Sequence, residues 1–194
     1  MNRFALIMLS LAVLSGCTSA PAPEEEKPQP PELVTGRSAF QKLYVSAHGW
    51  AGDAKAYQLE SQVVGDNHGA EGKAVVWRAA FASETQRSSR PYVWSGIDSP
   101  DAPSRGVSPG AQDNFTPGNA FDANFLKIDS DKAYQVAQKH GGDAIRGTPI
   151  TYRLEWAPGE NKLVWRVIYG SSRNDARLVV DVDATTGEFL RKEK

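Results

Sequence analysis

Cysteine is nearly missing from this 194-residue chain, which contains only Cys17. A single cysteine excludes a disulfide within the chain. Stability must therefore come from an apolar core, to which five tryptophans, six tyrosines and seven phenylalanines can contribute. The net charge of −1 includes no block of basic residues, which argues against a nucleic-acid partner.

Motifs of known catalytic and metal sites are also missing. The chain has neither a phosphate-binding loop nor a Gly-x-Ser-x-Gly turn. No further ligands stand at metal-binding spacing beside its three histidines, and the acidic stretch 181–188 does not fit an EF-hand loop. Asp129 and Asp131 fit the start of a helix better than a catalytic pair. We therefore expect a protein that is not an enzyme, with no catalytic residue, metal or cofactor.

The beginning of the chain carries its most specific pattern. Residues 1–3 form a short start with one positive side chain, Arg3; residues 4–14 are almost entirely apolar, and Ser15-Gly16 lead directly to Cys17. This apolar run is too short to span a membrane as a mature helix, and no later run is long enough either. The pattern resembles a bacterial lipoprotein signal peptide with its lipobox. The alternative is an ordinary cleavage site near a cysteine that carries no lipid.

The resemblance implies that residues 1–16 are removed and that Cys17 carries acyl chains. Each buried methylene contributes about 0.8 kcal/mol, so two or three chains anchor a protein firmly in membrane lipid. The residue after the cysteine is Thr18. In the Gram-negative lipoprotein pattern, a residue other than Asp at this position implies sorting to the outer membrane. We therefore expect the outer membrane, facing the periplasm, in a Gram-negative cell, and the single membrane in a Gram-positive one.

Residues 17–34 are predicted to form the lipidated terminus and an extended tether. Five prolines and a run of acidic residues fall between residues 18 and 32, and such a composition cannot bury enough apolar surface to fold. At about 3.1 Å per residue, the tether can hold the folded part up to about 50 Å from the membrane.

The remainder of the chain repeats itself. Residues 75–81 match residues 163–169 class by class, and residues 57–60 match 152–155. His48-Gly49 corresponds to His140-Gly141, and both histidines are expected at the C-terminal ends of helices rather than at metal sites. Several landmarks in one order indicate a duplicated unit.

Each predicted unit begins with apolar residues at helical spacing and continues with alternating strands. The first helix contains Phe40, Leu43, Tyr44 and Ala47, and the second contains Ala133, Val136 and Ala137. The predicted fold class is α+β, with two repeated units at 35–98 and 128–194. Each unit is a helix packed on an antiparallel β-meander. Residues 99–127, rich in proline and glycine, are predicted to be a loop or linker of mostly irregular structure.

The second unit resembles the PepSY domain. The resemblance rests on residues 128–137 at the start of a helix, residues 163–169, and the ending Val180-Asp-Val-Asp-Ala-Thr-Thr-Gly-Glu188. The first unit lacks the Asp-x-x-x-Gly-Glu ending, so its membership depends on the internal repeat. The resemblance implies an envelope protein with a role such as protease inhibition, and no catalytic residues. In architecture, a tandem of such units also resembles the β-lactamase inhibitory proteins, whose two repeats present a concave sheet to their target.

Alternation along the predicted strands places arginines and apolar residues on the sheet face away from the helices. Such mixtures are typical of protein interfaces, so the candidate partner-binding residues are Arg78, Arg153, Arg166, Ile168 and Val179. A second interpretation is also open: the two units could pack these faces against each other, because each is small. The arginines would then pair with Glu60, Glu155 or Asp181.

The predicted function follows from the anchor and from this face. We expect a lipid-anchored envelope protein that binds another envelope protein and inhibits it if that partner is, for example, a protease. The alternative is a structural or assembly lipoprotein of the outer membrane.

Overall fold

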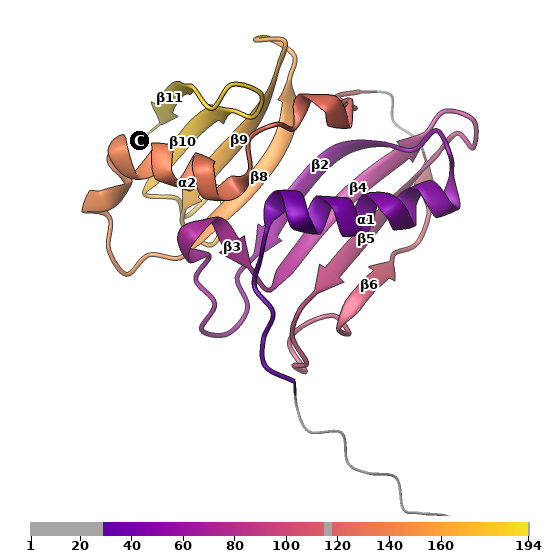
Figure 1. Ribbon diagram of the computed structural model, residues 1–194, viewed down its shortest axis with the longest axis horizontal. Coiled ribbons are helices and arrows are strands. Elements are labelled where there is room, and N and C mark those ends of the chain that lie inside the picture. Colours follow the sequence, from indigo (N-terminus) through magenta and orange to yellow (C-terminus); the bar gives the residue numbers. More distant parts are fainter. Residues whose placement is uncertain (1–28, 115–117, 194) are drawn as a thin grey trace, which may run out of the picture.

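The computed structural model describes residues 29–114 and 118–193, and within them one large antiparallel sheet carries two α-helices on the same face (Figure 1). The helices are α1 (Gly36–Trp50) and α2 (Ser130–Lys139). The nine-stranded sheet has the order β11-β10-β9-β8-β2-β4-β5-β6, and β7 also pairs with β5. The architecture is α+β, as the sequence predicted.

The first half of the sheet contains β2 (Lys55–Gln62), β4 (Val76–Ser83), β5 (Ser88–Ser95), β6 (Gly106–Pro109) and β7 (Asp113–Asn114). The second half contains β8 (Ile150–Ala157), β9 (Lys162–Tyr169), β10 (Leu178–Asp183) and β11 (Phe189–Glu193). A separate pair joins β1 (Val34–Thr35) to β3 (Lys73–Ala74). Short 3-10 turns are η1 (Ala70–Gly72), η2 (Ala123–Phe125) and η3 (Gly142–Ala144).

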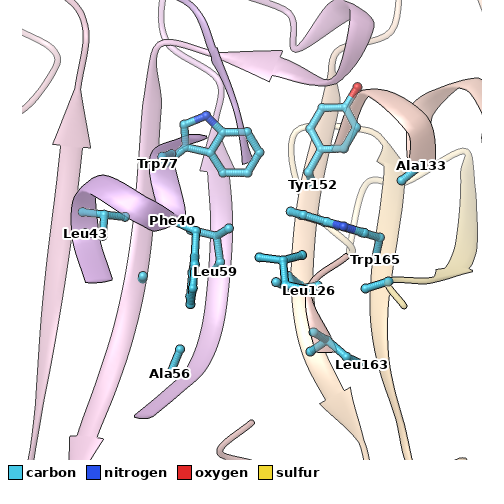
Figure 2. Packing of buried hydrophobic residues seen from close by; sticks show 14 of the residues in the cluster. Phe40, Leu43, Ala56, Leu59, Trp77, Leu126, Ala133, Tyr152, Leu163 and Trp165 are labelled. Carbon is cyan, nitrogen blue, oxygen red and sulfur yellow. The ribbon is translucent and has the colours of Figure 1, made fainter. Parts of the chain in front are cut away.

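The core lies between the helices and the sheet, and its residues are the ones that the helical and strand periodicities predict. Phe40, Leu43 and Ala133 are buried against strand residues such as Leu59 and Trp165 (Figure 2). Residues on one side of each strand alternate into this core, which is the pattern of a sheet covered on one face.

Two tryptophans occupy corresponding places in the two halves. The Trp77 indole donates a hydrogen bond to the Val34 carbonyl at 3.0 Å, and the Trp165 indole donates one to the Ile128 carbonyl at 2.9 Å. In each case the acceptor lies two residues before the first residue of a helix. The two rings meet edge to face, with centroids 6.3 Å apart. Each tryptophan thus fixes the start of its helix over the sheet.

The two halves join edge to edge through β2 and β8. These strands pair antiparallel, with Leu59 opposite Leu154 and Glu60 opposite Arg153. Packing of the two sheet faces against each other, the second interpretation of the sequence, is therefore wrong. An unpaired strand edge leaves backbone N–H and C=O groups unsatisfied, and mutual pairing satisfies them in both halves at once. The faces consequently lie side by side in one continuous sheet.

The register also corrects one detail of the sequence repeat. Arg78 lies opposite Glu60, whereas its counterpart Arg166 lies opposite Arg153. The stretches 57–60 and 152–155, which the sequence equates, are therefore offset by two residues in the sheet. A bulge in β2 between Ala56 and Gln58 adds to the difference, since a bulge changes which residues face each other.

The segment between the halves is more regular than expected. Residues 106–109 form β6, which extends the sheet beyond β5, a strand that the expectation of a mostly irregular loop did not include. The Phe121 amide donates to the Ala56 carbonyl at 2.8 Å, and the ring packs 6.1 Å from Phe40. Phe121 thus attaches this segment to the first half, whereas Phe125 packs against Trp156 of the second half, with ring centroids 5.3 Å apart.

The starts of the two helices meet, and Asp129 serves both. Its carboxylate accepts hydrogen bonds from the Ser130 amide at 2.7 Å and from the Arg37 amide at 2.8 Å. It also accepts a hydrogen bond from the Thr35 hydroxyl at 2.7 Å. The placement of Asp129 and Asp131 at a helix start is confirmed, because Asp129 is the N-cap of α2 and Asp131 lies in its first turn. The sequence analysis did not predict that Asp129 also caps α1, because that contact joins residues far apart in the chain.

The predicted signal peptide (residues 1–16) and the predicted lipidation site, Cys17, lie outside the described residues. The end of the predicted tether is described and packs on the first half: the Glu32 amide donates to the Gly96 carbonyl at 2.8 Å, and Arg105 donates to the carbonyls of Gln29 and Pro30. Among the described helices, none combines the length and the apolar character needed to span a membrane.

Candidate functional site

The sheet face away from the helices, which we call the open face, is crossed by one row of directly opposite side chains. In order along the sheet, the row consists of Ser108, Val93, Arg78, Glu60, Arg153, Arg166, Asp181 and Arg191. We call it the central row. Five of its charged residues belong to adjacent strands from β2 to β11, so opposite charges can meet across strands.

In the second half these charges form a continuous network of ion pairs. Arg153 lies 2.6 Å from Glu155 and 3.9 Å from Glu60. Arg166 lies 2.6 Å from Glu155 and 3.5 Å from Asp181. Arg191 lies 2.8 Å from Asp181 and also pairs with Glu160 and Glu193. The sequence analysis did not single out Arg191. The signal that could have found it is that adjacent residues of a strand, here Arg191 and Lys192, face opposite sides of the sheet.

Asp181 is the most deeply placed charge of this network. Its side chain is 2% exposed, between Arg166 and Arg191. Burial raises the pKa of the Asp181 carboxyl above its usual range, while the charges of the two arginines act in the opposite direction. Desolvation is therefore only partly offset by the ion pairs, as is common for buried charges.

A loop at residues 170–177 covers part of the open face. Asp175 fastens this loop by accepting hydrogen bonds from the amides and hydroxyls of Ser171 and Ser172, at 2.6 to 3.0 Å. Beneath it, Ala176 packs with Ile168 and Val179 in a small apolar cluster. The loop thus removes from water the apolar surface that β9 and β10 would otherwise expose.

Beside this loop the open face is hollowed. A cavity of about 650 Å³ lies over β2, β8 and β9. Glu60, Arg153, Glu155 and Arg166 line it, together with Asp101 and Arg173 from the surrounding loops. Oppositely charged groups alternate in the hollow, so it suits a polar protein segment better than an apolar ligand.

The structure separates the predicted partner-binding residues into two groups. Arg78 is exposed, and the Arg153 side chain is 41% exposed at the hollow. Arg166, only 13% exposed, is held by its two carboxylate partners, while Ile168 and Val179 are 5% and 2% exposed. Val179 is therefore covered by the loop, which alternation along one strand could not indicate. The pairing of Arg153 and Arg166 with Glu60, Glu155 and Asp181 agrees with the second interpretation of the sequence.

Neither helix-end histidine belongs to this face. The His48 ring is tilted against Tyr44 with ring centroids 4.2 Å apart, and His140, the C-cap of α2, stacks on Phe189 with centroids 3.8 Å apart. In the described part of the chain, no three His, Cys, Asp or Glu side chains gather in a way that could hold a metal ion. The side chains that line the hollow include charged groups and hydrogen-bonding groups.

Comparisons with known proteins identify a fold relative. No family model matches the chain, and no match was found among curated proteins. A solved structure, described as a "putative lipoprotein" from Clostridium difficile 630, is similar with a TM-score of 0.55. The similarity covers 80% of this chain and 91% of that one at 11% sequence identity. The chain therefore shares its overall fold with that protein.

Proposed function

We propose that this protein is a lipid-anchored envelope protein that binds another envelope protein through its open face and performs no chemistry of its own. One observation carries the proposal: both helices cover the same side of the sheet, and the other side keeps a hollow with accessible charged side chains. An antiparallel sheet commonly leaves one face to solvent, and the hollow gives this free face charged groups that can contact a protein partner. Inhibition follows if the bound partner is an enzyme such as a protease.

Three further features support this proposal. The two halves correspond in their tryptophan contacts and in the placement of one helix over each meander, as expected for two PepSY-like units. The fold resembles that of a protein described as a "putative lipoprotein". The Cys17 pattern supplies a membrane anchor.

Photocrosslinking from the open face in intact cells tests the binding proposal. A photoreactive residue replacing Gln62, which lines the hollow, is expected to trap one envelope protein. The same residue replacing Val45, which is 72% exposed on the opposite side in α1, is expected to trap at least tenfold less of it, because hot-spot contacts are local. Adducts should be quantified by immunoblot and identified by mass spectrometry.

The crosslinking outcomes decide between the candidate roles. Equal trapping from Gln62 and Val45 would contradict binding by the open face. A trapped component of an outer-membrane assembly machine would favour the alternative, a structural or assembly lipoprotein. A trapped hydrolase whose activity falls when the complex forms would establish inhibition.

Metabolic labelling with palmitate tests the anchor. The wild-type chain is expected to take up label and fractionate with membranes, because two or three acyl chains bind lipid firmly. Cys17→Ser should abolish both properties, whereas Thr18→Ser serves as the matched control and should change neither. In a Gram-negative cell, Thr18→Asp should keep the label and move the protein from the outer to the inner membrane. Label that persists in Cys17→Ser would refute lipidation at this residue.

A further inference from the structure

Arg78 is an arginine of the first half that lies on the open face. Arg78 lies in the middle of β4 and is exposed. Among the residues that the structure describes, Arg78 has no side-chain hydrogen bond or ion pair. Glu60 lies opposite it, but the Glu60 carboxylate accepts a hydrogen bond from Gln58 at 2.7 Å and lies 3.9 Å from Arg153. Glu60 is thus engaged by Gln58 and Arg153.

The second half shows what an arginine at this position binds. Arg166 corresponds to Arg78, since Arg78 directly follows Trp77 and Arg166 directly follows Trp165, the two tryptophans that bond to the helix starts. Arg166 pairs with Asp181, its cross-strand neighbour on β10, and with Glu155. At the place of Asp181 the first half has Val93, the cross-strand neighbour of Arg78 on β5. The first half therefore keeps the arginine and lacks the carboxylate.

The surroundings of Arg78 make it accessible to a protein. Ala80, Pro91 and Val93 lie beside it on the same face, and all three are small or apolar and half-buried. In the second half, Ile168 takes the place of Ala80 and is covered by the loop at 170–177. Apolar neighbours let a partner exclude water around the guanidinium, which strengthens a charge-assisted hydrogen bond.

We infer that the protein partner inserts an aspartate or glutamate side chain beside Arg78, where it takes the place that Asp181 occupies in the second half. This inference rests on the proposed binding by the open face and specifies the chemistry of the partner. The carboxylate binds the Arg78 guanidinium and fits above Ala80, Pro91 and Val93. Arg78 then contributes most to binding at the interface, and the paired charges of the second half form the polar rim of the interface.

A carbodiimide crosslink in intact envelopes tests this inference on the full-length chain. In the R78K variant, carbodiimide joins the new amine to a carboxylate in contact with it, with loss of water. We expect an adduct between position 78 and an Asp or Glu of the same protein that Gln62 traps. Adding V93D should supply the carboxylate from within the chain. The adduct to the partner should then fall at least tenfold, and a bond between positions 78 and 93 should replace it.

Loss of the guanidinium gives an independent measurement. R78M should reduce photocrosslinking from Gln62 by about tenfold or more, whereas Lys139→Met, an equal charge loss on α2, should leave it unchanged. Thermal melts confirm folding of each variant, and R78M decides the question if V93D does not fold. Unchanged trapping in R78M would overturn the inference and leave binding by the open face intact. Absence of any Gln62 adduct in the wild type would instead refute the proposed function.

Discussion

Asp181→Ala is expected to destabilise the folded protein by about 3 to 5 kcal/mol, the usual cost of removing one partner from a buried ion pair. The Asp181 side chain is 2% exposed, and its loss leaves Arg166 without one of its two carboxylates. Arg191 loses its partner at 2.8 Å but keeps Glu160 and Glu193. The uncompensated charge therefore falls mainly on Arg166, which is 13% exposed.

Urea unfolding at neutral pH measures this effect as the free energy of unfolding. The double variant Arg166→Met with Asp181→Leu should recover most of the loss, because apolar residues of similar size replace a buried pair at little cost. The exposed pair of Arg173 and Glu193 is the control, and Arg173→Ala should cost less than about 1 kcal/mol. A loss below 1 kcal/mol for Asp181→Ala would show that the network does not hold the second half together.

Asp129→Ala should destabilise the protein by about 2 to 3 kcal/mol, since one helix cap contributes about 1 kcal/mol and this carboxylate caps two helices. The Asp129 carboxylate accepts hydrogen bonds from the backbone amides of Ser130 in α2 and Arg37 in α1. The capping residue of α1, Thr35, makes no cap hydrogen bond of its own. The positive ends of two helix dipoles also meet here, so the negative charge is favourable for both.

Thermal unfolding followed by circular dichroism tests the double cap. Asp129→Asn should retain part of the stability, because an amide oxygen can accept the same hydrogen bonds without the charge. Asp122→Ala provides a matched comparison, because Asp122 caps only the three-residue turn η2. If the two alanine variants lost equal stability, the cap on α1 would contribute nothing.

The helices and most strands could be predicted because local pattern decides them. The spacing of Phe40, Leu43 and Ala47 and of Ala133 and Ala137 defines one apolar face on each helix, and all five are buried. Gly187 adopts a positive φ of 82° in the predicted turn, a conformation that glycine accepts readily. The strand β6 was missed, because the prolines and glycines around it dominate the pattern and its pairing partner is distant in sequence.

The candidate site was only partly predictable. Alternation correctly assigned Arg78, Arg153 and Arg166 to the open face, since it depends on strand geometry alone. It could not show that the loop at 170–177 covers Val179, or that Asp181 engages Arg166 while no described residue pairs with Arg78. Those differences depend on which strands are neighbours, and strand order is decided by contacts between residues far apart in the chain.

The sequence by itself determined the two helices, the alternating strands and the pattern around Cys17, because each depends on side chains that are close along the chain. The tertiary structure alone decided that β2 and β8 join edge to edge and that Asp129 caps a helix of the other half. It also decided that Asp181 pairs with Arg166, whereas Val93 stands at the corresponding place beside Arg78. These features arise when groups from distant segments satisfy one another's backbone and charge requirements, which no local pattern records.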